Sequence, residues 1–229
     1  MKRFALALLL ACGAAAAAEP QLPLVKLHYR VEWSSMTIGE ASFRLTRTGT
    51  DCYRYESQTT PTLLVRMIYG SPSERSDFCV QDGRVAARHF EFHNPHTESD
   101  SFTLDFDGRT HSVRDSQGRT RSIGDDPQDR LGLQQAVRLW LLQNKDKADP
   151  GTAAFTLVDQ NHARSYQVRV TGREPVDTPA GRFDTLVVQR VNDKKKSSTF
   201  WIAPAKGYMP VKVEQSRDGK LELRMVLAP

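Results

Sequence analysis

Residues 25–33 read VKLHYRVEW, with an apolar side chain at every odd position and a polar one at every even position. Because successive side chains of a β-strand point to opposite faces, this alternation predicts a strand with one buried and one solvated face. The same alternation returns along most of the chain, at residues 40–46, 89–93, 102–106, 166–170, 211–213 and 221–227. The sequence therefore predicts a mainly β protein.

Short turn motifs separate these segments. Asp82-Gly83, Asp107-Gly108 and Asp218-Gly219 each stand between two strand-like runs, where glycine supplies the positive φ of a tight hairpin. Strands joined in this way are antiparallel neighbours. A sheet with one apolar face must cover that face. We therefore expect a large, curled antiparallel sheet that forms an open or closed barrel-like structure.

One long amphipathic helix is expected to pack on or in this sheet. Asp126 provides an N-cap, Pro127 suits the first helical turn, and Pro150-Gly151 ends the segment. Its apolar stripe consists of Leu133, Val137, Trp140 and Leu141. A shorter helix is expected to begin at Thr60-Pro61. Because the chain contains no linker-like composition and no internal repeat, we expect residues 19–229 to form a single β-rich domain.

The N-terminal residues 1–18 have the layout of a secretory signal peptide. Lys2 and Arg3 precede a short apolar run, and three small residues, Ala16 to Ala18, precede Glu19. The sequence therefore predicts export to a bacterial periplasm after cleavage near Ala18. Cys12 leaves an alternative open, because residues 9–12 read LLAC, like a lipid-attachment box. Only eight apolar residues precede Cys12, so we favour soluble release over a lipid anchor.

Cys52 and Cys79 remain after this cleavage, and an even cysteine count in an oxidising compartment indicates a disulfide. Each cysteine lies on the polar face of its strand, since the residues beside it in sequence include Tyr53 in one case and Phe78 in the other. Two cysteines on the solvent side of neighbouring strands can meet without disturbing the core. We therefore predict a Cys52–Cys79 bridge.

The charge pattern argues against a nucleic-acid partner. The formal net charge is +5, but acidic and basic residues are interspersed, and Lys194 to Lys196 form the single basic run. We interpret this run as a solvated hairpin tip in preference to a lipid-binding patch.

A metal site is considered at His89, Glu91, His93 and His96, three of which share one face of a predicted strand. Alternate residues of a strand are about 6.5–7 Å apart, which is wide for joint ligation. The apolar Phe90 and Phe92 direct these side chains outward, so we expect a solvated face, with no metal and no cofactor. No catalytic motif is present, and we expect no enzyme.

The C-terminal third carries the most distinctive motifs. Residues 178–183 read TPAGRF, residues 200–204 read FWIAP, and residues 208–214 read YMPVKVE. Together with YRVEW at 29–33 and IGEA at 38–41, they resemble the bacterial family catalogued as domain of unknown function 3108, over nearly all of the mature chain. The resemblance implies an exported, β-rich protein and supplies no catalytic residues. The chain also resembles the curled half-barrels of periplasmic lipoprotein carriers, as an analogy of fold.

Three functions remain open at this point. The first is a non-enzymatic envelope protein that binds a hydrophobic, lipid-like ligand in a pocket between helix and sheet. Its lining is predicted to include Trp140, Trp201, Phe102 and Phe106, although packing in the core is the favoured role of Trp201. The second is an interaction or assembly scaffold for an envelope protein, with a packed core. The third is an envelope hydrolase, which would need a polar cluster around His162 or His89–His96 in a cleft. The sequence does not determine the oligomeric state.

Overall fold

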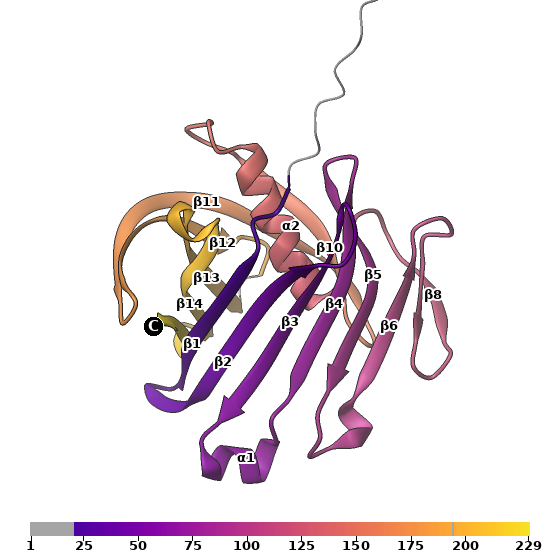
Figure 1. Cartoon of the computed structure of the whole chain (residues 1–229), viewed down its shortest axis with the longest axis horizontal. Coiled ribbons are helices and arrows are strands. Elements are labelled where there is room, and N and C mark those ends of the chain that lie inside the picture. The colour runs from indigo at the N-terminus through magenta and orange to yellow at the C-terminus, as the bar shows by residue number, and fades with distance from the viewer. Residues whose placement is uncertain (1–20, 194) are drawn as a thin grey trace, which may run out of the picture.

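A computed structural model describes residues 21–193 and 195–229 and shows one curled sheet of fifteen strands around a central helix (Figure 1). Residues 1–18, which the sequence predicts to be a signal peptide, lie outside the described residues, as does Lys194. Within the described ranges, no helix is both long and apolar enough to cross a bilayer.

The first half of the chain forms eight antiparallel strands in sequence order, which are β1 (Val25–Trp33), β2 (Met36–Arg47), β3 (Cys52–Pro61), β4 (Ser73–Gln81), β5 (Arg84–His93), β6 (Phe102–Asp107), β7 (Ser112–Asp115) and β8 (Thr120–Ser122). The short helix α1 (Leu63–Tyr69) connects β3 to β4, and a single 3-10 turn, η1 (Glu98–Asp100), precedes β6. The expected short helix is present, but it begins at Leu63, because Thr60 and Pro61 still belong to β3.

The second half contains the strands β9 (Pro127–Gln128), β10 (Thr152–Val158), β11 (Ala163–Thr178), β12 (Gly181–Arg190), β13 (Lys196–Ala203), β14 (Met209–Arg217) and β15 (Lys220–Ala228). The helix α2 (Arg130–Gln143) connects β9 to β10, and the 3-10 turn η2 (Pro204–Lys206) connects β13 to β14. The last strand, β15, pairs with β1, so the two halves join in the middle of the sheet.

The sheet is open, and its edges are β8 and β9, although these strands are neighbours in sequence. Instead of pairing with β8, β9 lies against β5, where Gln128 Nε2 donates a hydrogen bond to the carbonyl oxygen of Val85 at 2.7 Å. The β7–β8 hairpin contacts the β10–β11 turn through side chains, since the guanidinium of Arg121 donates to the carbonyl oxygens of Asp159 and Gln160. The sheet therefore curls round without completing a ladder between its edges.

The curled, mainly β architecture with an internal helix agrees with the expectation from sequence, but the sheet is not wholly antiparallel. Strands β9 and β10 are parallel. A parallel pair needs a crossover connection, and α2 provides it. Two residues are too few to show a strand periodicity, which is why the sequence did not reveal β9.

Two tight turns agree with the sequence and one does not. Asp82-Gly83 and Asp218-Gly219 both have positive φ at both positions, the geometry of a two-residue hairpin turn. Asp107-Gly108 is instead the start of a longer loop that ends before Ser112. There Asp107 Oδ1 accepts hydrogen bonds from the backbone N–H groups of Arg109 and Thr110. The Asp side chain therefore organises this loop.

Candidate functional site

The helix α2 is held inside the curl at its N-terminus by Asp129. Its Oδ1 accepts hydrogen bonds from the backbone N–H groups of Leu131 and Gly132 at 2.8 and 2.7 Å, and its Oδ2 accepts one from Ser76 Oγ at 2.7 Å. Asp129 is fully buried, and burial raises the pKa of its carboxyl group to about 6. One side chain thus caps the helix and ties it to β4.

This geometry corrects the helix start expected from the sequence. Asp126 is not the cap, and Pro127 is not in the first helical turn. Pro127 belongs to β9, and the helix begins three residues later, at Arg130. Asp126 has a φ of 54°, which is left-handed and unlike the extended φ and ψ of a typical N-cap.

The middle of α2 is anchored by a buried arginine. Arg138 is 1% exposed, and its guanidinium donates to the carbonyl oxygens of Gly207 and Pro23, both at 2.6 Å, and to Gln135 Oε1 at 3.1 Å. Burial lowers the pKa of Arg138 to about 10, so it stays charged at neutral pH. Gly207 has a φ of +63°, and a Cβ there would lie 2.9 Å from Arg138 Nη2. A glycine is therefore required where the chain approaches this guanidinium.

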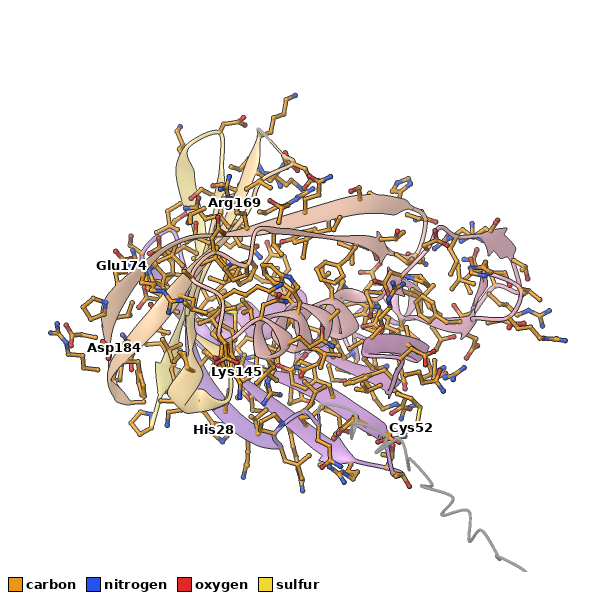
Figure 2. The ribbon with its side chains drawn as sticks, turned by 90° about the horizontal axis from the view of Figure 1, so that it is seen from above. His28, Cys52, Lys145, Arg169, Glu174 and Asp184 are labelled. Carbon is orange, nitrogen blue, oxygen red and sulfur yellow. A yellow bond between two sulfur atoms is a disulfide. The ribbon has the colours of Figure 1, made fainter. Side chains whose placement is uncertain are left out.

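An apolar cavity of about 140 Å³ lies between α2 and both halves of the sheet. Leu133, Gln134 and Val137 of α2 form one wall. The first half of the sheet contributes Tyr29, Phe43 and Tyr55, and the second half contributes Tyr166, Val168, Phe200, Ile202, Tyr208, Met209, Pro210, Val213, Gln215 and Met225. In Figure 2, α2 lies between the violet strands of the first half and the orange strands of the second. None of these lining residues carries a charge.

Two of the four tyrosines in the cavity wall, Tyr29 and Tyr55, donate hydrogen bonds within the protein. Tyr29 Oη donates to the carbonyl oxygen of Pro210 at 2.7 Å, and Tyr55 Oη donates to Gln134 Oε1 at 3.3 Å. Burial raises the pKa of both tyrosines, so both remain neutral. The cavity therefore suits an uncharged, apolar group.

The four aromatic residues predicted to line a pocket lie outside this cavity lining. Phe102 and Phe106 belong to β6 and are both buried, and Phe102 packs against Phe90 and Phe92 of β5. Trp140 is half-buried beside a polar depression at the β4–β5 turn. Trp201 lies on the opposite face of β13 from Phe200 and Ile202, which belong to the cavity wall.

Trp201 is 8% exposed and has polar neighbours. Its Nε1 donates to Glu174 Oε1, and the ammonium of Lys212 lies 4.1 Å from the centre of its ring. Strand alternation identified the inward-facing positions of the sheet. It did not show which of them oppose α2, because that depends on the order of distant strands.

The predicted disulfide is confirmed. Cys52 and Cys79 are directly opposite each other in the β3–β4 ladder, with Cα atoms 3.9 Å apart and a bonded sulfur pair. Their neighbours Tyr53 and Phe78 are buried on the other face and stack with ring centres 5.7 Å apart. The bridge thus lies outside the core.

Three of the four side chains considered for metal binding, His89, Glu91 and His93, have separate partners. His89 Nδ1 lies 2.7 Å from Asp105 Oδ1, Glu91 pairs with Arg75 at 3.0 Å, and His93 Nδ1 lies 3.7 Å from Glu98. Across the described residues, no three metal-ligating side chains come together. His162, considered for a hydrolase, is exposed in the β10–β11 turn.

Comparison with known proteins relates the chain to a sequence family and to a solved structure of similar fold. The family described as "Protein of unknown function (DUF3108)" matches residues 28–226. A crystal structure of a β-barrel-like protein of the domain of unknown function DUF1849 from Brucella abortus is similar in fold, with a TM-score of 0.60 and 10% identity, covering 91% of this chain and 97% of that one. No functionally curated protein matches the chain. Since the family match spans nearly the whole described fold, the chain belongs to the DUF3108 family.

Proposed function

We propose that the mature chain is an exported, non-enzymatic protein that binds an apolar chain or ring in the cavity beneath α2. The uncharged lining from three separate parts of the chain is the observation that supports this most directly. A cavity of about 140 Å³ is close in size to one of about 150 Å³ that holds benzene. It has room for one ring or the end of an acyl chain, and a larger ligand would need α2 or residues 207–210 to move.

The binding proposal is tested with a fluorescent fatty acid and a variant that fills the cavity. Val137→Phe adds bulk at the helix wall, and Val191→Phe makes the same change at a position that is 47% exposed, outside the lining. Wild type and Val191→Phe should bind saturably and release the probe to unlabelled fatty acid, whereas Val137→Phe should bind at least about tenfold more weakly.

Circular dichroism and melting temperature show whether each variant is folded. Absence of saturable binding to wild type across fatty acids and phospholipids would overturn the binding proposal and leave an interaction scaffold as the alternative. Equal binding by the two variants would place the ligand outside this cavity.

Export is supported by the disulfide and by the pattern of residues 1–18. When the full chain is expressed in a Gram-negative bacterium, N-terminal sequencing of the periplasmic fraction should find Glu19 as the first residue. A diacylated Cys12 in the membrane fraction would show the lipid-anchored alternative, and an unprocessed cytoplasmic chain would exclude export.

A further inference from the structure

Exposed apolar side chains are concentrated at one end of the sheet. Among the described residues, nine large hydrophobic side chains are exposed, and seven of them belong to α1 or to the β1–β2 hairpin: Trp33, Met36, Leu63, Leu64, Met67, Ile68 and Tyr69. Isolated exposed leucines are ordinary in proteins, but a contiguous apolar patch marks an interaction surface. We call these seven residues the apolar tip.

The helix α1 has its apolar surface turned away from the protein. Residues three or four positions apart share a helix face, so Leu63, Leu64, Met67 and Ile68 lie on one side. They are 62% to 74% exposed, and α1 contains no buried residue. The opposite side, with Val65 and Tyr69, faces an apolar groove that reaches Trp33 of β1. Figure 1 shows α1 projecting below the strands that it connects.

The shape and chemistry of the apolar tip fit a lipid surface. Its outer surface is a projecting helix with Leu, Met and Ile side chains, and a Trp and a Tyr lie on its inner border, along the groove. Such residues partition into the boundary between headgroups and acyl chains, where aromatic rings are favoured.

The charges of the β12–β13 and β14–β15 turns, farther along the same edge of the sheet, favour anionic lipid. Arg66 is the one charged residue of α1. Along the same edge of the sheet, Ser34 N donates to the carbonyl oxygen of Glu222, so the β14–β15 turn lies beside the β1–β2 turn. Asp218 N donates to the carbonyl oxygen of Lys195, so the β12–β13 turn follows next along the edge. Lys195, Lys196 and Lys220 are exposed there, while Glu222 and Asp193 pair with Arg217 and Arg190. Among the described residues of these two turns, Asp218 is the one acidic residue without an ion pair, so the three exposed lysines are in excess within the turns.

We propose that the apolar tip inserts into the interfacial region of an anionic phospholipid bilayer and holds the protein on the membrane surface. A tip of this size buries few side chains, so the binding is reversible and depends on both apolar contact and charge. This proposal does not depend on the ligand proposed for the cavity beneath α2, because the two sites share no lining residue.

The test is flotation with vesicles of phosphatidylethanolamine and phosphatidylglycerol, using the chain from Glu19 onward, which keeps every described residue and excludes a lipid on Cys12. Leu64→Glu introduces a charge at a position that is 74% exposed, and Leu24→Glu makes the same change at one that is 57% exposed outside the apolar tip. Wild type and Leu24→Glu should float, and Leu64→Glu should bind at least about tenfold more weakly. Vesicles of phosphatidylcholine alone should bind all three more weakly.

Trp33 provides a second measurement at the site itself. Its emission should shift to shorter wavelength on vesicle addition, and Trp33→Phe should remove that shift, since Trp33 is 45% exposed, whereas Trp140 is half-buried and Trp201 is buried, both outside the apolar tip. Absence of flotation, or equal flotation of Leu64→Glu and wild type, would overturn the proposal. A dimer that Leu64→Glu dissociates, without flotation, would assign the apolar tip to a second copy of the chain. Flotation that Val137→Phe retains would separate this site from the cavity.

Discussion

Asp129 combines two roles that impose opposite demands on its carboxyl group. As the N-cap of α2 it accepts two backbone N–H groups, which favour the charged form, yet its full burial disfavours charge and raises its pKa to about 6. A carboxyl group with a raised folded-state pKa adds stability that is fully present below its unfolded pKa, about 3.9. That stability is lost as pH rises through about 6. Ionised Asp129 is therefore a cost of folding at neutral pH.

Asp129→Asn should remove this pH dependence. Asn is also a good N-cap, and its amide can donate to Ser76 Oγ in place of the hydroxyl hydrogen bond. Between about pH 4 and 7, the stability of wild type relative to Asp129→Asn should fall by up to about 3 kcal/mol, measured by urea unfolding.

Asp125→Asn, at an exposed carboxylate four residues earlier, controls for the removal of one charge. Parallel pH profiles for wild type and Asp129→Asn would show that the carboxyl group titrates normally despite its burial.

At the scale of elements, the two helices occupy opposite environments. Leu139 of α2 is 2% exposed, whereas Leu64 of α1 is 74% exposed. Leu139→Ala should cost about 2–5 kcal/mol of unfolding free energy, because it leaves a cavity in the core. Leu64→Ala should change it by less than about 0.5 kcal/mol, as at other surface positions.

Urea unfolding of the two alanine variants compares the same chemical change in two helices. Similar losses would contradict the assignment of α2 to the interior and α1 to the surface.

The sequence predicted that α2 exists but not how deeply it is enclosed. An apolar stripe with polar residues opposite is typical of a helix on a surface, yet Gln135 and Arg138 are also buried. They can be buried because Arg138 reaches carbonyl oxygens of residues 23 and 207, which are far away in the sequence. A single-sequence pattern has no signal for such partners. The Cys52–Cys79 pair was predictable because the number of cysteines, and the face of the strand on which each lies, can both be read directly from the sequence.

At the scale of the whole molecule, the order of strands within each half follows from hairpins, which short turns encode. The pairing of β1 with β15 and the failure of β8 and β9 to pair are long-range outcomes. Because the cavity lies between the two halves of the sheet, its formation also depends on these long-range pairings. Its wall includes Tyr29 of β1 and Met225 of β15, whose inward orientation is predictable but whose proximity is not.

The pairing of β1 with β15 also sets an order of events in folding. Most strands can pair with a neighbour in sequence, but β1 acquires its second partner only from the last strand of the chain. Contacts between such distant residues slow folding, and an unpaired edge is a template for aggregation. A chain that emerges N-terminus first therefore exposes the edge of β1 until residues 220–228 have followed. For the proposed exported protein, this edge needs protection, by a chaperone or by rapid completion of translocation, during the interval before the two halves join.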